Sequence, residues 1–210
     1  MKDVKSEALR YLGYRGNPPD DATAALLEKG YDELRRTAEP RCISAVSDKS
    51  DLSHILLGSD IQKHLANSDR VIVFAATLGS TADRLIRTAE ITNMAYALIL
   101  DALASAMIEE CCDNAEKELH EKIPGFFTWR FSPGYGDYPL DVQSEIIRLL
   151  NADKRIGLTV TSSDILIPRK SVTALIGVSD TEQDKGKRGC ATCKLRETCS
   201  FRIGGTTCAT

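Results

Sequence analysis

The sequence has no excess of either charge sign. Its 210 residues contain 27 Lys and Arg and 30 Asp and Glu, which gives a formal net charge of −3 at pH 7. Acidic and basic residues are interspersed, so they create no field of the kind that gathers nucleic acid or anionic lipid. We therefore expect no nucleic-acid partner.

The sequence also lacks a long apolar run and an export signal. The longest apolar stretch, residues 94–108, is shorter than the roughly 20 residues needed to span a bilayer, and Asp101 lies in its middle. The first residues contain no apolar segment followed by a small-residue cleavage site. The sequence therefore predicts a buried helix at 94–108, no membrane role and a cytoplasmic location.

Several motifs of common enzyme classes are missing. There is no P-loop, no complete GxGxxG and no nucleophile elbow, which argues against NTPases, Rossmann dehydrogenases and α/β-hydrolases. Asp51, His54 and Gly58 loosely resemble the D-x-H-x-x-G loop of corrinoid carriers, but both gaps differ. We therefore do not expect the chain to carry a corrinoid itself.

The seven cysteines are unevenly distributed, with four in the last 21 residues. The pattern Cys190-x2-Cys193-x5-Cys199-x8-Cys208 offers four thiolates, which suit a tetrahedral zinc or a 4Fe–4S cluster. Zinc sites usually contain a second close pair, so the spacing favours the iron–sulfur cluster. The alternative is a tail of reduced thiols without a metal. Cys42, Cys111 and Cys112 are interpreted as small buried hydrophobes without chemistry.

Hydrophobic periodicity predicts an α+β domain at residues 1–180 and a cysteine-rich tail at 181–210, where the composition changes to Lys, Gly, Thr and Cys. Helices are predicted at 3–12, 21–38, 59–66, 93–122 and 141–151. Strands are predicted at 41–46, 71–76, 126–131, 155–161, 165–167 and 172–178, the last three as neighbouring antiparallel strands.

The segment Arg130-Phe-Ser-Pro-Gly-Tyr135 combines a guanidinium and a phenol on either side of a rigid turn. Arginine can bind a carboxylate through two parallel hydrogen bonds, and a Pro-Gly backbone can approach a ligand closely. The pattern therefore indicates a clamp for a small molecule. The alternative is an arginine in an ion pair beside a tyrosine packed in a loop.

The wider pattern resembles the activation domain of cobalamin-dependent methionine synthase. The order and spacing match the family signature RxxPGY…P…LL…IG…LT…MxPxxSVSG, and the helix segment Asp101 to Glu109 is similar to the family's KALADRLAE helix. The matching residues are Arg130 to Tyr135, Pro139, Leu149, Leu150, Ile156 to Thr161, Pro168, Ser171 and Val172. The resemblance covers residues from about 95 to 178, and it implies an α+β fold with a twisted antiparallel sheet flanked by helices.

This resemblance implies S-adenosylmethionine as cofactor and the cobalamin of a partner as target. In the family, the domain docks on the corrinoid domain of methionine synthase, and an electron plus a methyl group restore methylcobalamin. By resemblance, Arg130 holds the ligand, Tyr135 faces the corrinoid and Glu109 lies nearby. The loop residues Ser132, Pro133 and Gly134 line the site with their backbone.

The chain departs from the family after residue 178, where it lacks the aromatic segment that helps to hold adenosine. Three functions therefore stay open. The first is an activator of a corrinoid-binding methionine synthase or related methyltransferase, with a reductant protein as a further partner. The second is a non-catalytic docking or chaperone module for a corrinoid protein, and the third is an iron–sulfur electron-transfer protein.

Overall fold

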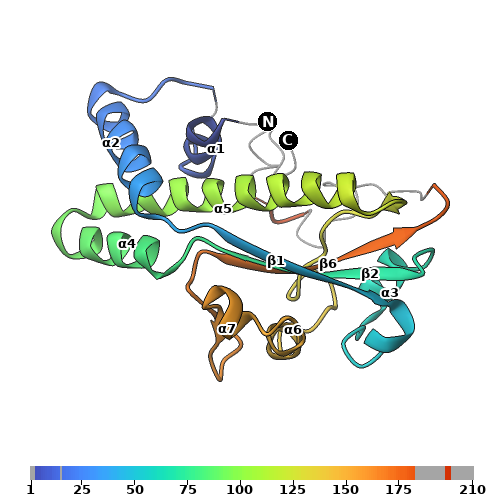
Figure 1. Cartoon of the computed structure of the whole chain (residues 1–210). Helices are drawn as coiled ribbons and strands as arrows, with labels where there is room; N and C mark the ends of the chain where they lie inside the picture. Colours follow the sequence, from blue (N-terminus) through green and yellow to red (C-terminus); the bar gives the residue numbers. More distant parts are fainter. Residues whose placement is uncertain (1–2, 15, 183–196, 200–210) are drawn as a thin grey trace.

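The computed structural model describes residues 3–14, 16–182 and 197–199. Its centre is a four-stranded antiparallel sheet in the order β1-β2-β6-β3. Figure 1 shows these strands, which are β1 Arg41–Asp48, β2 Arg70–Thr77, β6 Ser171–Ser179 and β3 Phe126–Phe127. The two central strands are buried along most of their length because helices cover both faces, which is why their sequences contain continuous apolar runs.

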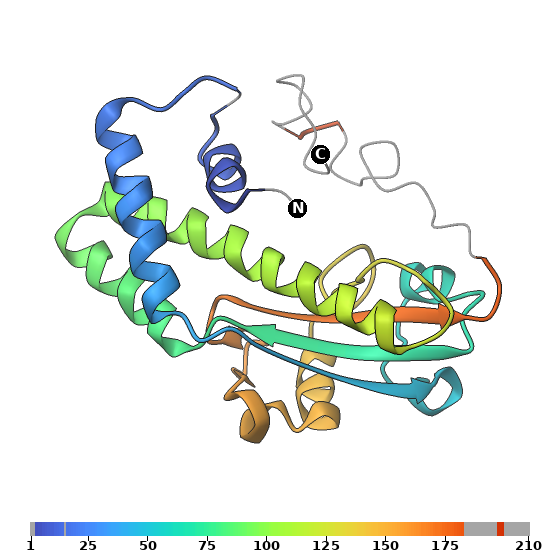
Figure 2. The same cartoon turned by 45° about the horizontal axis from the view of Figure 1, so that its top comes forward.

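The long helix α5 Met94–Lys122 lies along one face of the sheet (Figures 1 and 2). Asn93 caps its start, because the Asn93 side chain accepts a hydrogen bond of 3.1 Å from the backbone N–H of Tyr96. The helices α1 Val4–Tyr11, α2 Asp21–Thr37 and α4 Ser80–Thr92 all pack against α5. Helix α5 is therefore enclosed by protein on several sides over its first half.

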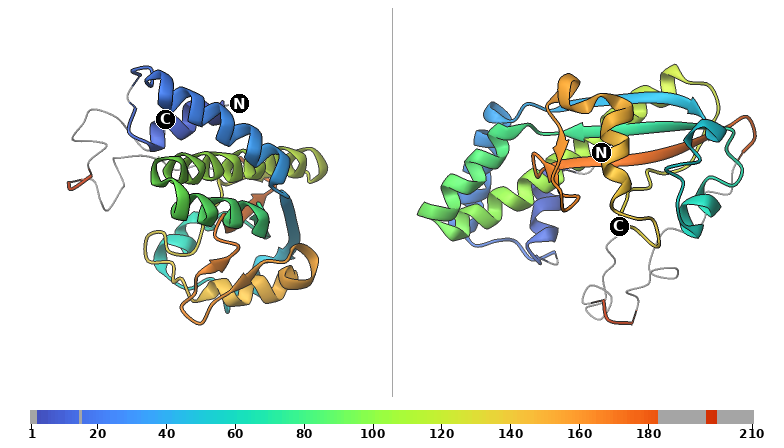
Figure 3. Two further views of the ribbon diagram at one scale, coloured as in Figure 1. Left: turned by 90° about the vertical axis from the view of Figure 1, so that its left-hand side faces the viewer. Right: turned by 90° about the horizontal axis from the view of Figure 1, so that it is seen from below.

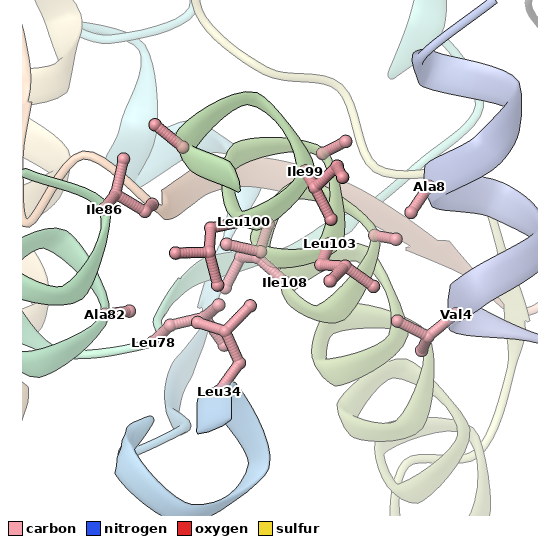
Figure 4. Packing of buried hydrophobic residues seen from close by; sticks show 14 of the residues in the cluster. Val4, Ala8, Leu34, Leu78, Ala82, Ile86, Ile99, Leu100, Leu103 and Ile108 are labelled. Carbon is pink, nitrogen blue, oxygen red and sulfur yellow. The ribbon is translucent and has the colours of Figure 1, made fainter. Parts of the chain in front are cut away.

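The core on this face is built around α5. Figure 4 shows Leu100, Leu103 and neighbouring side chains of α5 among apolar side chains from the surrounding elements. The surrounding contributions are Val4 and Ala8 of α1, Leu34 of α2, Leu78, and Ala82 and Ile86 of α4. Among the described residues, no helix is long and apolar enough to cross a membrane.

The opposite face of the sheet carries a second core. It is covered by η1 Lys49–Leu52, α3 Ser59–His64, α6 Val142–Leu150 and α7 Ala152–Ile156, and Figure 3 shows the last two across the strands. Alternate residues of β2 serve the two cores: Val71, Val73 and Ala75 face this one, and Phe74 and Ala76 face α5. The predicted α+β class with an antiparallel sheet and flanking helices is confirmed.

The predicted antiparallel pairing of the last three strands is confirmed for the first two and wrong for the third. The first part of residues 155–161 belongs to α7, which starts after Asn151 turns the chain through a left-handed conformation with φ 52°. Strands β4 Thr159–Val160 and β5 Leu166–Ile167 pair only with each other, and β6 joins the main sheet between β2 and β3. The three segments thus belong to two different sheets.

The predicted strand at 126–131 is shortened to Phe126–Phe127. The cause is Thr128, whose hydroxyl accepts a hydrogen bond of 2.8 Å from the backbone N–H of Gly177 in place of a backbone partner. Thr128 still donates its backbone N–H to the carbonyl of Gly177 at 3.0 Å, and Phe131 then exchanges two backbone hydrogen bonds of 2.9 Å with Leu175. The segment that leads into residue 132 is therefore attached to the sheet without being a continuous strand.

We expect Leu103→Ala to lower the free energy of unfolding by about 2–5 kcal/mol, because Leu103 is fully buried at the centre of the α5 core. The matched control is Leu98→Ala on the same helix, whose side chain is 57% exposed and whose loss should change stability by less than about 0.5 kcal/mol. Urea denaturation of both variants measures the difference. Equal effects would contradict the assigned core.

Candidate functional site

The loop that follows Phe131 is held by its own backbone. The N–H of Gly134 donates to the carbonyl of Tyr138 at 2.9 Å, and the N–H of Tyr138 donates to the carbonyl of Tyr135 at 3.0 Å. Pro133 is buried beneath this turn, whereas Tyr135 is 68% exposed. The turn therefore presents the Tyr135 phenol to solvent on a well-ordered backbone.

A loop–helix interlock, formed by Gly58, Asp60, Gly136 and Asp137, fixes the far side of this loop. The Asp137 carboxylate caps the start of α3: it accepts hydrogen bonds of 2.8 Å from the backbone N–H of Ser59, from the Ser59 hydroxyl and from the backbone N–H of Asp60. In return, the Asp60 carboxylate accepts a hydrogen bond of 3.1 Å from the backbone N–H of Asp137. Each segment thus satisfies the backbone of the other.

The two glycines of the interlock are required by geometry. Gly58 and Gly136 have φ values of 101° and 58°. A Cβ added to Gly58 would lie 2.7 Å from the carbonyl oxygen of Asp137, and one added to Gly136 would lie 2.2 Å from a carboxylate oxygen of Asp60. Only residues without a side chain therefore allow the two segments to approach this closely.

Aromatic side chains support the loop from below. The ring of His64 lies 4.3 Å from that of Trp129 and 5.0 Å from that of Phe131, measured between centroids. Its Nε2 donates a hydrogen bond of 2.8 Å to the carbonyl of Trp129. Tyr138 is buried beside Phe131, and burial raises the pKa of its phenol well above the ordinary value. This packing gives the loop a rigid base.

Arg130 lies under the other side of the loop and points to α5. Its guanidinium pairs with the acidic trio, which consists of Glu109, Asp113 and Glu116: the distances are 3.2 Å to Glu109 and 2.7 Å to Asp113, and the closest contact is with Glu116. Only 12% of the Arg130 side chain is exposed. Burial opposes its charge, but hydrogen bonding to Asp113 and the charge of Glu116 outweigh burial and keep the pKa of Arg130 above its ordinary value.

The acidic trio carries more negative charge than Arg130 neutralises. The side chains of Glu109 and Asp113 are 50% and 58% exposed, so their carboxylates also face solvent. Tyr11 of α1 lies close enough to Glu109 to feel its charge. Burial, and then the charges of Glu7 and Glu109, raise the pKa of Tyr11 to about 12. The site is thus an acidic surface around one buried cation.

The structure joins some of the predicted site residues directly and leaves others apart. Glu109 and Arg130 form an ion pair, and Ser132, Pro133 and Gly134 form the turn that follows Arg130. Within the described residues, the ion pairs and hydrogen bonds of Arg130 do not include Tyr135. The structure therefore contains the ion-paired arginine that was the alternative interpretation of the RxxPGY segment.

Sequence reasoning missed Asp113, Glu116, Asp60 and Asp137. A signal existed for the first two, because residues 109, 113 and 116 are spaced by four and three and therefore share one face of the predicted helix. No local signal identified Asp60 and Asp137, because they are 77 residues apart. Their pairing follows only from the tertiary fold.

The predicted metal ligands can be located only in part. Cys190, Cys193 and Cys208 lie outside the described residues, whereas Cys199 is described and partly buried. Over residues 3–14, 16–182 and 197–199, no group of three or more His, Cys, Asp or Glu side chains is arranged to hold a metal ion. The tail prediction stays a prediction.

A pocket of about 210 Å³ lies at the opposite end of α5, between α2, α4 and α5. Its polar side chains include Lys29, Glu33 and Tyr96, and the Tyr96 hydroxyl donates a hydrogen bond of 2.9 Å to Glu33. None of the residues that line it belongs to the acidic trio or to the loop around Tyr135. We therefore place the candidate site at Arg130 and not at this pocket.

Comparisons with known proteins bear on the fold. No family model and no curated protein matches the sequence. Among solved structures, the chain is similar to the MetH reactivation domain bound to AdoHcy, with a TM-score of 0.58 and 14% identity over 98% of this chain and 84% of that chain. The chain therefore has the fold of that reactivation domain, as the sequence resemblance implied.

The contribution of the interlock to stability can be tested by removing the Asp137 carboxylate. We expect Asp137→Ala to lower the free energy of unfolding by about 1–2 kcal/mol, because the start of α3 loses its cap. Asp141→Ala is the matched control: Asp141 precedes α6 but forms no side-chain cap hydrogen bond, so its loss should change stability by less than about 0.5 kcal/mol. Chemical denaturation compares the two, and a larger effect at Asp141 would contradict the interlock.

Proposed function

We propose that this chain is a stand-alone activation module that supports reductive methylation of the cobalamin held by a methionine synthase or related corrinoid methyltransferase. The observation that carries the proposal is the position of Arg130, ion-paired to Glu109 and directly before the loop of Tyr135, in a chain with the fold of the MetH reactivation domain. That solved relative is bound to AdoHcy, the product that S-adenosylmethionine leaves after methyl transfer.

The proposed reaction needs one electron and one methyl group. The electron comes from a reductant protein and reduces the partner's oxidised cob(II) form. S-adenosylmethionine, held by Arg130, would supply the methyl group and leave as S-adenosylhomocysteine, and the electron pair of the new cobalt–carbon bond would come from the reduced cobalt of the partner. The chain's part is to hold the methyl donor at the surface where the corrinoid docks, which supplies proximity and orientation.

The charges of the site suit S-adenosylmethionine. This ligand carries a carboxylate, an ammonium and a cationic sulfonium. In the proposal, Arg130 binds the carboxylate, because its three contacts with the acidic trio use only three of its five N–H groups. The exposed carboxylates of Glu109 and Asp113 then face the cationic groups. Because the trio exceeds Arg130 in charge, S-adenosylmethionine should bind more tightly than its neutral-sulfur product.

The loop residues supply the remaining roles. The backbone of Ser132, Pro133 and Gly134 lines the ligand, and the exposed Tyr135 faces the corrinoid of the partner. The interlock between Asp60 and Asp137 supports this role, because it keeps the turn in place before any ligand or partner arrives. Tyr135 and Glu109 are therefore the proposed groups at the reacting centre.

We further propose that residues 181–210 form a separate cysteine-rich tail in which Cys190, Cys193, Cys199 and Cys208 bind a 4Fe–4S cluster, with zinc as the alternative. Such a cluster beside a corrinoid could pass on the electron that the reaction needs. The support is the close spacing of the four thiols in a segment that follows the last strand of the packed sheet.

The ligand proposal predicts that the full-length, reduced protein binds S-adenosylmethionine in calorimetric titration. Arg130→Ala should weaken binding roughly 10- to 100-fold, because a charge-assisted contact to the carboxylate is lost. Arg148→Ala is the matched control, since the Arg148 side chain is 70% exposed and forms an ion pair with Glu145 of its own helix. Binding should be unchanged in this variant.

Arg130→Lys provides a second variant that keeps the charge facing the acidic trio but loses the planar fork. Binding that falls in both Arg130 variants, with an unchanged circular dichroism spectrum, supports the clamp. A wild-type protein that binds a corrinoid partner but gives no heat with S-adenosylmethionine would overturn the methyl-donor role. The docking-module function would then remain.

The tail proposal predicts that anaerobically purified protein absorbs visible light and contains iron and acid-labile sulfide in equal amounts. The double variant Cys190→Ser, Cys193→Ser should lose both, because half of the ligands are removed. Cys42→Ser should retain both, since Cys42 lies in β1 and is not part of the tail. A colourless wild-type protein with stoichiometric zinc would contradict the cluster.

A further inference from the structure

Two cysteines outside the candidate site lie unusually close together. The Sγ atoms of Cys42 and Cys111 are 3.1 Å apart, although the residues are 69 positions apart in sequence. Both side chains are free thiols and partly buried. A disulfide bond is about 2.05 Å long, so the two sulfur atoms need to approach by only about 1 Å to form one.

The pair spans the contact between the sheet and the central helix. Cys42 lies on the edge strand β1, and its side chain packs against the core that surrounds α5, whereas the next residue, Ile43, faces the opposite core. Cys111 belongs to the middle of α5 and packs against the same core. Figure 1 shows β1 passing beneath α5. The two thiols therefore meet across a tertiary contact, not within one element.

The chemistry of the two thiols is unequal. Either sulfur of the pair can be the hydrogen-bond donor, and the contact between them lowers the pKa of Cys111 and raises the pKa of Cys42. Cys111 is therefore the thiol that more readily becomes a thiolate, the reactive form. The adjacent Cys112 differs, since it is fully buried and burial raises its pKa.

We propose that Cys42 and Cys111 form a reversible disulfide, a modification site that ties the edge strand to the central helix, with a low-molecular-weight disulfide of the glutathione class as the oxidant. The Cys111 thiolate attacks one sulfur of the oxidant, forming a mixed disulfide and releasing one thiol. The sulfur of Cys42 then attacks the Cys111 sulfur and releases the second thiol. Two protein thiols and one small disulfide thus become one protein disulfide and two small thiols.

The disulfide would lie next to the acidic trio of the candidate site. Cys111 lies on α5 between Glu109 and Asp113, two members of the acidic trio. Oxidation therefore fixes β1 to the same turn of helix that pairs with Arg130. It also closes a covalent loop from Cys42 to Cys111, which removes conformations from the unfolded chain and should raise the thermal midpoint.

The test uses the full-length protein, reduced, desalted without oxygen and then incubated with oxidised glutathione. After alkylation of the remaining thiols, trypsin releases Cys42 in peptide 42–49 and Cys111 in peptide 88–117. We expect these two peptides to be joined, with two hydrogens fewer than their sum, and to separate with dithiothreitol. The joined pair should exceed that from urea-denatured protein by roughly tenfold or more, because folding raises the effective concentration of the thiols.

Matched variants identify the partner of Cys42. Cys112→Ser should leave the link intact, whereas Cys111→Ser should abolish it and leave Cys42 alkylated or bound to glutathione. The thermal midpoint of the wild type and of Cys112→Ser should rise on oxidation, and that of Cys111→Ser should not. Recovery of peptide 42–49 unlinked from the native wild type, or a link that persists in Cys111→Ser, would overturn the proposal. The comparison of disulfide yield between native and urea-denatured wild-type protein tests the proposal even if a variant does not fold.

Discussion

The burial of α5 on several sides is the constraint on which the rest of the structure depends. A helix that is apolar around most of its circumference cannot be covered by one layer. In this chain, the sheet covers one side, and α1, α2 and α4 cover the others. The sheet then has a second apolar face, which α6 and α7 cover in turn. The layered arrangement therefore follows from the need to bury first α5 and then the second face of the sheet.

The second half of α5 meets a different requirement, because its exposed face is charged. The acidic trio faces Arg130, whose side chain is only 12% exposed. An exposed pair on the same helix, such as Lys122 with Glu118, contributes little because water screens it and both side chains stay mobile. The pairs of Arg130 are held more firmly, because the backbone of Phe131 is bonded to β6 and cannot move away from α5. The change from apolar to acidic along one helix thus separates the part that builds the core from the part that builds the site.

Much of the fold could be predicted from periodicity, and much of the site could not. The long helix at 93–122 and the strands at 41–46, 71–76 and 172–178 were identified because their apolar patterns match their burial. The segment at 155–161 was predicted wrongly as one strand. Its first two residues belong to α7, which begins after the left-handed Asn151, and local β-propensity gives no sign of this helix. Arg130 was predicted to be a binding residue from its motif, but its ion pairs with Asp113 and Glu116 could not be predicted, because they depend on how the loop packs against α5. The meeting of Cys42 with Cys111 has the same origin, because sequence alone describes two isolated cysteines.

The interlock of Gly58, Asp60, Gly136 and Asp137 also limits how such a sequence can diverge. Each glycine makes room for the other segment, and each carboxylate bonds to the backbone of the other segment. A single replacement at any of the four positions leaves its partners with a clash or an unmet hydrogen bond, so change is tolerated only when both segments change together. Relatives that keep this arrangement should therefore show linked variation between two stretches far apart in the chain, and that pattern would mark the loop even where overall identity is too low to align the rest.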